Sequence, residues 1–286
     1  MEQNHHNQPL ISVVIPAMNE EHNLPHVLPF IPLTVHEVIL VDGNSTDNTI
    51  TAAQELWPSI RIVKQAGKGK GAALRQGFEA STGDIIVMLD ADGSANPREI
   101  PRFVDSLLKG YDFAKGSRFM RGGGSHDITF VRTTGNFLLS RFVNLLYWTN
   151  FTDLCYGYNV FWKYCLNYIN VDTDGFEVET LISLRILRAK LKIIEIPSFE
   201  YPRVHGASNL NTFRDGWRVL KTILKERVRE VPHALQVHHF ASLPKTTDQL
   251  PVTKLPVEPT TDALATPPLL LEPAKQSHLE RVRSTK

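Results

Sequence analysis

The stretch DIIVMLDADGSANP, residues 84–97, contains the pattern from which the fold can be inferred. An apolar run rich in β-branched residues leads into two acids, Asp90 and Asp92. These are followed by Asn96 and Pro97, a capping residue and a first-turn proline that are typical of a helix start. An unbroken apolar strand that passes through a short turn into a helix is typical of a parallel sheet covered on both faces. The two acids have two explanations: they hold a metal ion and a diphosphate, or they belong to a loop that starts the next helix.

The same strand–helix unit recurs through the first two-thirds of the chain. Apolar runs lie at residues 10–15, 37–41, 60–63 and 84–89, and helical segments follow at about 20–31, 46–56, 68–80 and 97–109. This alternation predicts an α/β fold with a mostly parallel sheet and helices on both faces. Ligands bind such sheets at the carboxyl ends of the strands, which is where Pro16, Asp42 and Asp90 fall.

The pattern changes after residue 110. We expect strands at 111–119 and 191–197, a mobile loop at 122–127, and helices at about 130–148, 175–190 and 210–230. From about residue 231 the composition shifts to proline, threonine, serine and charged residues, which predicts disorder. We therefore divide the chain into a flexible N-terminus (1–9), one domain (10–230) and a Pro/Thr-rich disordered tail (231–286).

The composition excludes several classes of protein. The net charge is +1, which gives no electrostatic reason to expect nucleic acid as a partner. The 2 cysteines form no CxxC pair, which argues against a disulfide scaffold or a zinc site and fits a reducing compartment. The N-terminus has no apolar segment typical of a secretory signal, and we find no apolar stretch long enough to span a membrane. We expect a cytoplasmic protein whose contact with the cytoplasmic face of the membrane, if it has one, is peripheral.

Three motifs at the ends of expected strands contain residues that could bind a nucleobase, a phosphate or a metal ion. In VDGNSTDNT (41–49) the Asp can accept a hydrogen bond from a nucleobase, although the motif also reads as a capped turn. AGKGKGAALRQGF (66–78) is a glycine-rich turn that opens a helix, so Lys68 or Lys70 could reach a phosphate; the alternative is a loop with solvated lysines. The DXD motif Asp90-Ala-Asp92 can bind Mg²⁺ or Mn²⁺, whose remaining positions take diphosphate oxygens.

The order and spacing of the motifs resemble those of the inverting family 2 glycosyltransferases, which have the Rossmann-like GT-A fold with a mixed, mostly parallel sheet. The first four matching motifs are VVIPAMNEEHNLP (13–25), VDGNSTDNT (41–49), GKGKGAALRQGF (67–78) and LDADGSANP (89–97). The next four are KGSRF (115–119), TDLCYGYNVFWK (152–163), GFEVET (175–180) and RVHGASN (203–209). Within the family, the GSRF element and the late RxxGxS pattern look most like the polyprenol-phosphate hexosyltransferases, such as the dolichol-phosphate mannosyltransferases.

This resemblance implies a reaction. A hexose would move from a nucleotide-diphosphate sugar, of the GDP-mannose or UDP-glucose type, to polyprenyl phosphate. Transfer would depend on Mg²⁺ or Mn²⁺, invert the anomeric carbon and serve cell-envelope glycan biosynthesis. A soluble saccharide or small hydroxyl compound is the alternative acceptor. A nucleotidyltransferase is a weaker alternative, because its glycine-rich loop should follow the first strand, where PAMNEE stands. A non-catalytic nucleotide-sugar binder is disfavoured by the intact acids.

The motifs and the resemblance together assign roles to individual residues. The donor would be bound by Pro16, Ala17, Asn19, Glu20, Asp42, Lys70, Asp90 and Ala91. The metal ligands would be Asp90, Asp92 and His205. The acceptor would be bound by Arg118, Arg132, Arg203 and Ser208, and the catalytic residues would be Asp92, Glu177, Glu179 and Arg118.

Several of these roles have alternatives. Ser94 stands where the dolichol enzymes resemble one another in carrying an amide, which leaves the third metal ligand open; His205 could fill it or be an ordinary loop residue. Glu177 and Glu179 cannot face the same way on a helix, so one could act as a base while the other caps the helix or orients a ligand. A hydroxyl acceptor would need such a base. A phosphate acceptor is already an anion at neutral pH and would not.

The helix expected at 212–230 is amphipathic. Its apolar residues are Phe213, Trp217, Leu220, Leu224 and Val228, and an adjoining stripe carries Arg214, Arg218, Lys221 and Lys225. Such a helix can lie on an anionic membrane surface. Alternatively, its apolar face packs on the catalytic domain. The helix at 130–148 is a second candidate for lipid contact.

Overall fold

The computed structural model describes residues 8–206 and 210–229. Residues 1–7 of the flexible N-terminus predicted at 1–9, the predicted acceptor residue Ser208 and the predicted tail at 231–286 lie outside the described residues.

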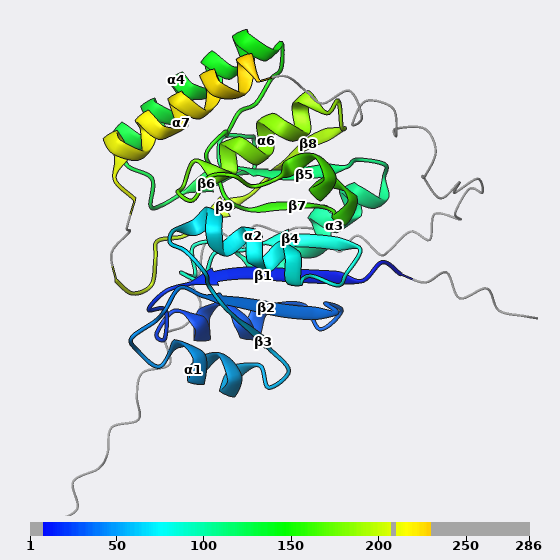
Figure 1. Ribbon diagram of the computed structural model, residues 1–286, viewed down its shortest axis with the longest axis vertical. Helices are drawn as coiled ribbons and strands as arrows, with labels where there is room; N and C mark the ends of the chain where they lie inside the picture. Colours follow the sequence, from blue (N-terminus) through cyan, green and yellow to red (C-terminus); the bar gives the residue numbers. More distant parts are fainter. Residues whose placement is uncertain (1–7, 207–209, 230–286) are drawn as a thin grey trace, which may run out of the picture. The chain divides into compact units, whose positions relative to one another are not determined.

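A seven-stranded sheet, in the order β3-β2-β1-β4-β7-β5-β8, runs through the described region (Figure 1). Its strands are β1 (Ile11–Ala17), β2 (Glu37–Asp42), β3 (Arg61–Lys64), β4 (Ile85–Met88), β5 (Phe113–Ser117), β7 (Asn159–Trp162) and β8 (Ile193–Pro197). Neighbouring strands are parallel except at β7, which runs antiparallel to both β4 and β5. The predicted mixed, mostly parallel sheet is confirmed.

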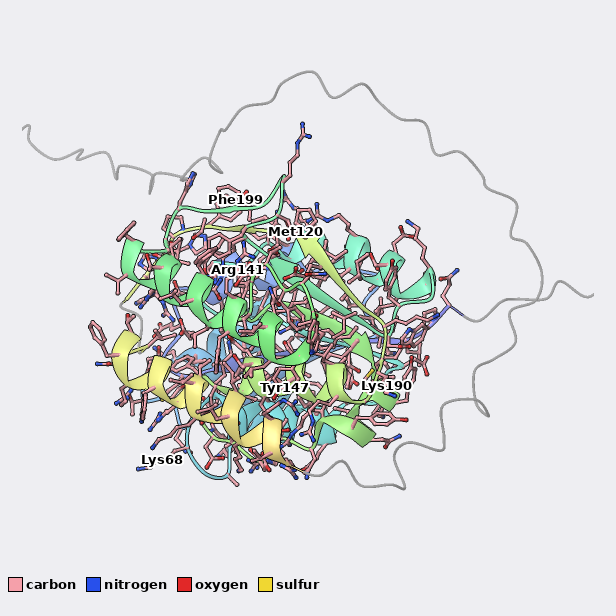
Figure 2. The ribbon with its side chains drawn as sticks, turned by 90° about the horizontal axis from the view of Figure 1, so that it is seen from above. Lys68, Met120, Arg141, Tyr147, Lys190 and Phe199 are labelled. Atoms are coloured by element: carbon pink, nitrogen blue, oxygen red, sulfur yellow. The ribbon has the colours of Figure 1, made fainter. Side chains whose placement is uncertain are left out.

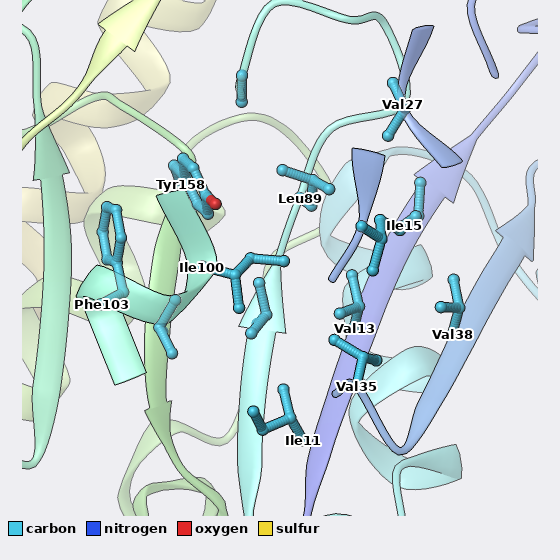
Figure 3. Packing of buried hydrophobic residues seen from close by; sticks show 14 of the residues in the cluster. Ile11, Val13, Ile15, Val27, Val35, Val38, Leu89, Ile100, Phe103 and Tyr158 are labelled. Atoms are coloured by element: carbon cyan, nitrogen blue, oxygen red, sulfur yellow. The ribbon is translucent and has the colours of Figure 1, made fainter. Parts of the chain in front are cut away.

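Helices cover both faces of this sheet because each strand alternates its side chains between the faces. Val13 and Ile15 of β1 belong to a buried cluster with residues of α1 (Thr49–Leu56) and α3 (Ile100–Leu108), and Figure 3 shows part of it around Ile100 and Phe103. Val14, between them, belongs to a second cluster with α2 (Lys70–Ala80) and α6 (Val178–Arg188). The doubly covered sheet expected from the sequence is therefore present.

Two long helices, α4 (Phe130–Tyr147) and α7 (Thr212–Val228), lie side by side (Figures 1 and 2). The hydroxyl of Tyr147 donates to the carbonyl of Ile223 over 3.0 Å. A third buried cluster, which includes Val143, Leu184 and Val219, joins the pair to α6. The shorter elements are η1 (Leu24–His26), η2 (Leu28–Phe30), η3 (Pro97–Glu99), η4 (Lys163–Cys165), α5 (Leu166–Ile169), β6 (Gly124–Ser125) and β9 (Phe199–Glu200).

Three predictions about local structure were wrong or incomplete. The helix expected at 20–31 is two single 3₁₀ turns, because Pro25 and Pro29 each lack the amide hydrogen that a longer helix would use. The loop expected at 122–127 contains β6, which pairs with β9. Strand β7 was not predicted; it runs antiparallel to its two neighbours and so departs from the parallel strand–helix pattern.

Among the residues described, we find no helix of sufficient length and hydrophobicity to cross a membrane.

Candidate active site

A cavity of about 520 Å³ lies at the carboxyl ends of the central strands and is bounded by α4 and α7. Loops after β1 and β4 supply its floor, and the two long helices supply residues on another side. It is lined by these predicted site residues: Pro16, Ala17, Glu20, Lys70, Asp90, Ala91, Asp92, Arg118, Arg132, Glu179 and Arg203. The fold therefore gathers residues from both the donor and the acceptor assignments around one space.

Lys70 joins two of the predicted acids. Its Nζ lies 2.6 Å from Oδ1 of Asp90 and 2.5 Å from Oε1 of Glu179. Burial alone would lower the pKa of Lys70, but the two carboxylates outweigh it and raise the pKa above its ordinary value. Burial also raises the pKa of Glu179, and Lys70 opposes that shift. Lys70 is therefore a fixed cation, and Glu179 is held in an ion pair.

The glycines of the GKGKG loop have a packing role that the sequence did not reveal. A Cβ on Gly69 would lie 2.1 Å from the carbonyl oxygen of Asp174, and one on Gly71 would lie 2.0 Å from that of Thr173. The amide of Gly71 donates to the same Asp174 carbonyl over 3.0 Å. The close approach of two backbones requires glycine here, and it brings the start of α2 beside the segment that leads into α6.

Asp92 is paired with Arg203 from a distant loop. The guanidinium of Arg203 lies 3.3 Å from Oδ2 of Asp92 and 3.1 Å from Oε1 of Glu20. Burial raises the pKa of Glu20, while Asn23 and Arg203 oppose the shift. Arg203, predicted to bind the acceptor, thus lies with residues assigned to the donor.

The two DXD acids fit a divalent metal ion. Asp90 and Asp92 both line the cavity. Their carboxylates are the hard oxygen donors that Mg²⁺ prefers, together with ligands from a bound phosphate. His205 does not join them. Its ring lies 5.6 Å from that of His22 and 6.0 Å from that of His26, measured between centroids. Within 8–206 and 210–229, no three His, Cys, Asp or Glu side chains gather as a metal cluster.

Arg118 is already engaged by two carboxylates. Its Nε donates to Asp153 over 2.7 Å, its Nη2 donates to the same carboxylate, and its Nη1 donates to both oxygens of Glu200 at 3.1 Å. The guanidinium is also stacked over Tyr156, 4.8 Å from the ring centroid. These contacts neutralise the cation and fix its position in the lining of the cavity.

Arg132 and Asn136 lie one turn apart on α4, and both line the cavity. No residue in the described ranges forms an ion pair with Arg132. Asn136 is buried and accepts a hydrogen bond from the amide of Cys155, but its Nδ2 has no partner among the described residues. Asn136 was not predicted as a site residue, although its spacing of four from Arg132 was a usable signal.

Three more predicted site residues, Asn19, Asp42 and Glu177, are not part of the described lining of the cavity. Oδ1 of Asn19 accepts the amide of Thr46 over 2.7 Å, and Oδ1 of Asp42 accepts the amide of Ser45 over 3.2 Å, so both side chains order the turn after β2. Glu177 precedes α6, and its Oε2 is buried without a partner in the described part of the chain. Glu177 and Glu179 have different surroundings, as their spacing requires.

Comparison with known proteins identifies a family and a fold. Residues 12–167 match the family described as Glycosyl transferase family 2. The chain is 29% identical to the glycosyltransferase AglJ of Haloferax volcanii, in an alignment covering 72% of this chain and 68% of that protein. It is 30% identical to a dolichol-phosphate mannosyltransferase of Pyrococcus furiosus, covering 70% and 59%. It is 27% identical to a polyprenol monophosphomannose synthase of Mycolicibacterium smegmatis, covering 70% and 80%.

Among solved structures, the chain is similar to glucosyl-3-phosphoglycerate synthase from Mycobacterium tuberculosis in complex with phosphoglyceric acid. The TM-score is 0.62 at 26% identity, covering 78% of this chain and 82% of that one. The same enzyme in complex with Mg²⁺ and uridine-diphosphate gives a TM-score of 0.62 at 23% identity. These similarities support the GT-A fold.

Proposed function

The chain belongs to glycosyl transferase family 2, and from this premise we propose that it moves a hexose from a nucleotide-diphosphate sugar to polyprenyl phosphate, with inversion at the anomeric carbon. The relatives named for transfer to dolichol or polyprenol phosphate support this acceptor. A donor of the GDP-mannose or UDP-glucose type is part of the same proposal.

One observation carries this proposal: a single cavity has carboxylates on one side and uncommitted donors on the other. Asp90 and Asp92 provide the oxygens that suit a metal and the donor diphosphate. Arg132 and the unpaired amide of Asn136 line the same cavity and suit an acceptor phosphate. The two substrates would therefore meet between the end of β4 and helix α4.

Asp90 and Asp92 would hold a Mg²⁺ or Mn²⁺ ion, which would neutralise the charge that develops on the departing diphosphate. In the structure Lys70 and Arg203 balance the charges of these acids. Lys70 is buried and held by two carboxylates, so we assign it to fixing the orientation of Asp90 and not to moving a proton.

An oxygen of the acceptor phosphate would attack the anomeric carbon as the bond from that carbon to the diphosphate oxygen breaks. The electron pair leaves with the nucleoside diphosphate. Because the phosphate is anionic at neutral pH, no side chain has to remove a proton from it. Glu179 is committed to Lys70, and this arrangement favours a phosphate acceptor over a hydroxyl acceptor, which would need a free base.

A soluble acceptor is the second candidate. The structural neighbour bound to phosphoglyceric acid supports it, because that enzyme is named for glucosyl-3-phosphoglycerate. The two candidates share the fold and the donor class, and they differ in whether the product partitions into an organic solvent.

Peripheral contact with a membrane is part of the proposal for the lipid acceptor. On α7 four of the five apolar residues named from the sequence are exposed and Leu220 is half-buried. Phe213 is 82% exposed and Val228 is 81% exposed, whereas Val219 and Ile223 form the buried face. On α4, Leu145 is 73% exposed. An apolar stripe beside basic residues suits the surface of an anionic bilayer.

The test is a transfer assay with labelled UDP-glucose and GDP-mannose, Mg²⁺ or Mn²⁺, and a short-chain polyprenyl phosphate in detergent. Parallel reactions contain phosphoglyceric acid or a free sugar. We expect label in the butanol phase with one donor only. Label that stays in the aqueous phase on a soluble acceptor would replace the first candidate with the second.

A further inference from the structure

The charges of the cavity are divided unevenly between its two sides. Three of its cations each contact two carboxylates: Lys70 contacts Asp90 and Glu179, Arg118 contacts Asp153 and Glu200, and Arg203 contacts Glu20 and Asp92. The remaining three arginines in the lining, Arg132, Arg214 and Arg218, lie on α4 and α7. Among the described residues, Asp215 is the one acid that forms an ion pair with any of these three arginines. Asp127 also lines the cavity but pairs with none of them in the described part of the chain.

Asp215 holds two guanidinium groups at the edge of the cavity. Nε of Arg214 and Nη1 of Arg218 each lie 3.3 Å from the same oxygen of Asp215, which is 2% exposed. The other oxygen accepts the amide of Asn211 over 2.8 Å. One carboxylate thus anchors two cations and leaves a net positive charge.

The anchored arginines keep donors free. Arg214 uses only Nε in this contact, so within the described part of the chain its two terminal nitrogens have no ion-pair partner; the same holds for Nε and Nη2 of Arg218. A guanidinium with free, co-planar N–H groups matches two oxygens of a phosphate. Both side chains line the cavity, so they are placed to contact a ligand inside it.

We propose that Arg214 and Arg218 of α7, together with Arg132 of the neighbouring α4, bind the phosphate of the acceptor. This inference rests on the proposed function and names a phosphomonoester as the ligand, whether it is carried by a lipid or by a small molecule. Arg203 then belongs to the donor side, where it contacts Glu20 and Asp92. Helix α7, which lies beyond residues 12–167 of the family match, thus supplies part of the acceptor site.

The experiment compares Arg214→Gln and Arg218→Gln, singly and together, with Lys221→Gln and Lys225→Gln. The control lysines lie on the same helix and carry the same charge, but the described lining of the cavity does not include them. We measure KM for a short-chain polyprenyl phosphate in detergent, KM for the nucleotide sugar, and calorimetric binding of the acceptor without donor. Losing a charge-assisted hydrogen bond should raise the acceptor KM about 10-fold for each arginine. The donor KM and the control variants should be unchanged.

A further variant separates an effect of charge on acceptor binding from an effect of the substitution on folding. Asp215→Asn keeps an oxygen for the Asn211 amide and releases both arginines, so acceptor binding should be retained or improved. Thermal unfolding of every variant shows whether a loss is structural. If the double arginine variant binds the acceptor as well as the wild type but binds anionic vesicles less well, the arginines contact bilayer headgroups and the inference is wrong.

The assay also separates this inference from the proposed function. Suppose that the wild type transfers hexose to polyprenyl phosphate and the arginine variants have the same acceptor KM as the wild type. The inference about the arginines is then wrong, but the proposed function stands. If the wild type transfers hexose to phosphoglyceric acid and the variants raise that KM, the phosphate site stands and the lipid acceptor does not. Transfer only to acceptors without phosphate overturns both.

Discussion

At the scale of single residues, Gly157 controls the ion pair between Lys70 and Glu179. A Cβ at this position would lie 2.4 Å from Oε1 of Glu179 and 2.9 Å from Nζ of Lys70. These are the far ends of two side chains, but they are paired with each other, and Lys70 is also held by Asp90. A methyl group here must therefore move the buried charges.

Replacing Gly157 with Ala should lower both stability and transfer. We expect the free energy of unfolding to fall by about 1–3 kcal/mol, the range for overpacking a buried site, and kcat to fall about 10-fold because Asp90 loses its fixed partner. Gly135→Ala is the matched control for stability, since a Cβ there meets nothing within 4 Å and alanine favours the helix. Denaturant unfolding and initial rates check both. Equal effects of the two substitutions would contradict the account.

Lys115 is a buried cation without a direct ion pair in the described residues. Its Nζ donates to the carbonyl of Tyr156 over 2.8 Å and contacts Oδ1 of Asn159 at 3.4 Å. Burial lowers its pKa, and the carboxylates of Asp153, Glu179 and Glu195 only partly oppose this. The protonated lysine therefore reduces the stability of the fold at neutral pH.

The effect of Lys115 on stability should depend on pH with a definite sign. The unfolded chain binds the proton up to about pH 10.5, whereas the folded chain releases it earlier, so the free energy of unfolding rises with pH in that window. A tenfold change in proton affinity corresponds to about 1.4 kcal/mol. Relative to Lys115→Met, the wild type should gain stability as the pH rises toward about 10.5. Denaturant titrations at each pH measure this gain, and a constant difference would show that the pKa is not lowered.

At the scale of elements, helices α4 and α7 expose apolar side chains beside basic ones. Trp217 is 59% exposed on α7, and Trp148, just after α4, is 94% exposed. The buried face of α7 is made instead by Val219, Thr222 and Ile223, together with two acids. The apolar stripe recognised in the sequence is therefore mostly exposed to solvent. Helix α7 packs on the domain through a different face, formed by the buried residues named above.

Changing Phe213 and Trp217 to Ser should weaken binding to anionic vesicles about 10-fold or more, because both side chains are exposed aromatic groups on α7. Transfer to a short-chain acceptor in detergent should change little. Leu33→Ser, at a residue 93% exposed outside these helices, is the control. Sedimentation with vesicles measures the binding. If the Phe213→Ser and Trp217→Ser variants bind vesicles as well as the wild type and the Leu33→Ser control do, this apolar stripe has no membrane role.

The elements were largely predictable from sequence, and the contacts within the site were not. Local signals such as the Asn96 cap and the continuous apolar run of β1 predicted the sheet and most helices. The pairing of Arg203 with Asp92 and that of Lys70 with Glu179 join segments far apart in the chain. No local pattern specifies such pairs, because they depend on how the loops pack at the ends of the strands.

At the scale of the whole described region, the fold brings two groups of charges to one cavity. The strand ends supply acids that are balanced by Lys70 and Arg203, and the helix pair α4–α7 supplies arginines that outnumber their acids. A donor diphosphate with its metal suits the first group, and an acceptor phosphate suits the second. Their separation is the physical basis of the proposed transfer.

The most direct test of the central claim is transfer of labelled hexose to polyprenyl phosphate by the wild type and by Asp92→Asn, with and without a chelator. We predict a butanol-soluble sugar-phosphate lipid from the wild type, and rates at least about 100-fold lower for Asp92→Asn and in the chelated reaction, since a lost metal contact costs several kcal/mol of transition-state stabilisation. Asp105→Asn, at an exposed acid on α3, should transfer as the wild type does. An Asp92→Asn protein that forms the lipid product at the wild-type rate would contradict the proposed mechanism.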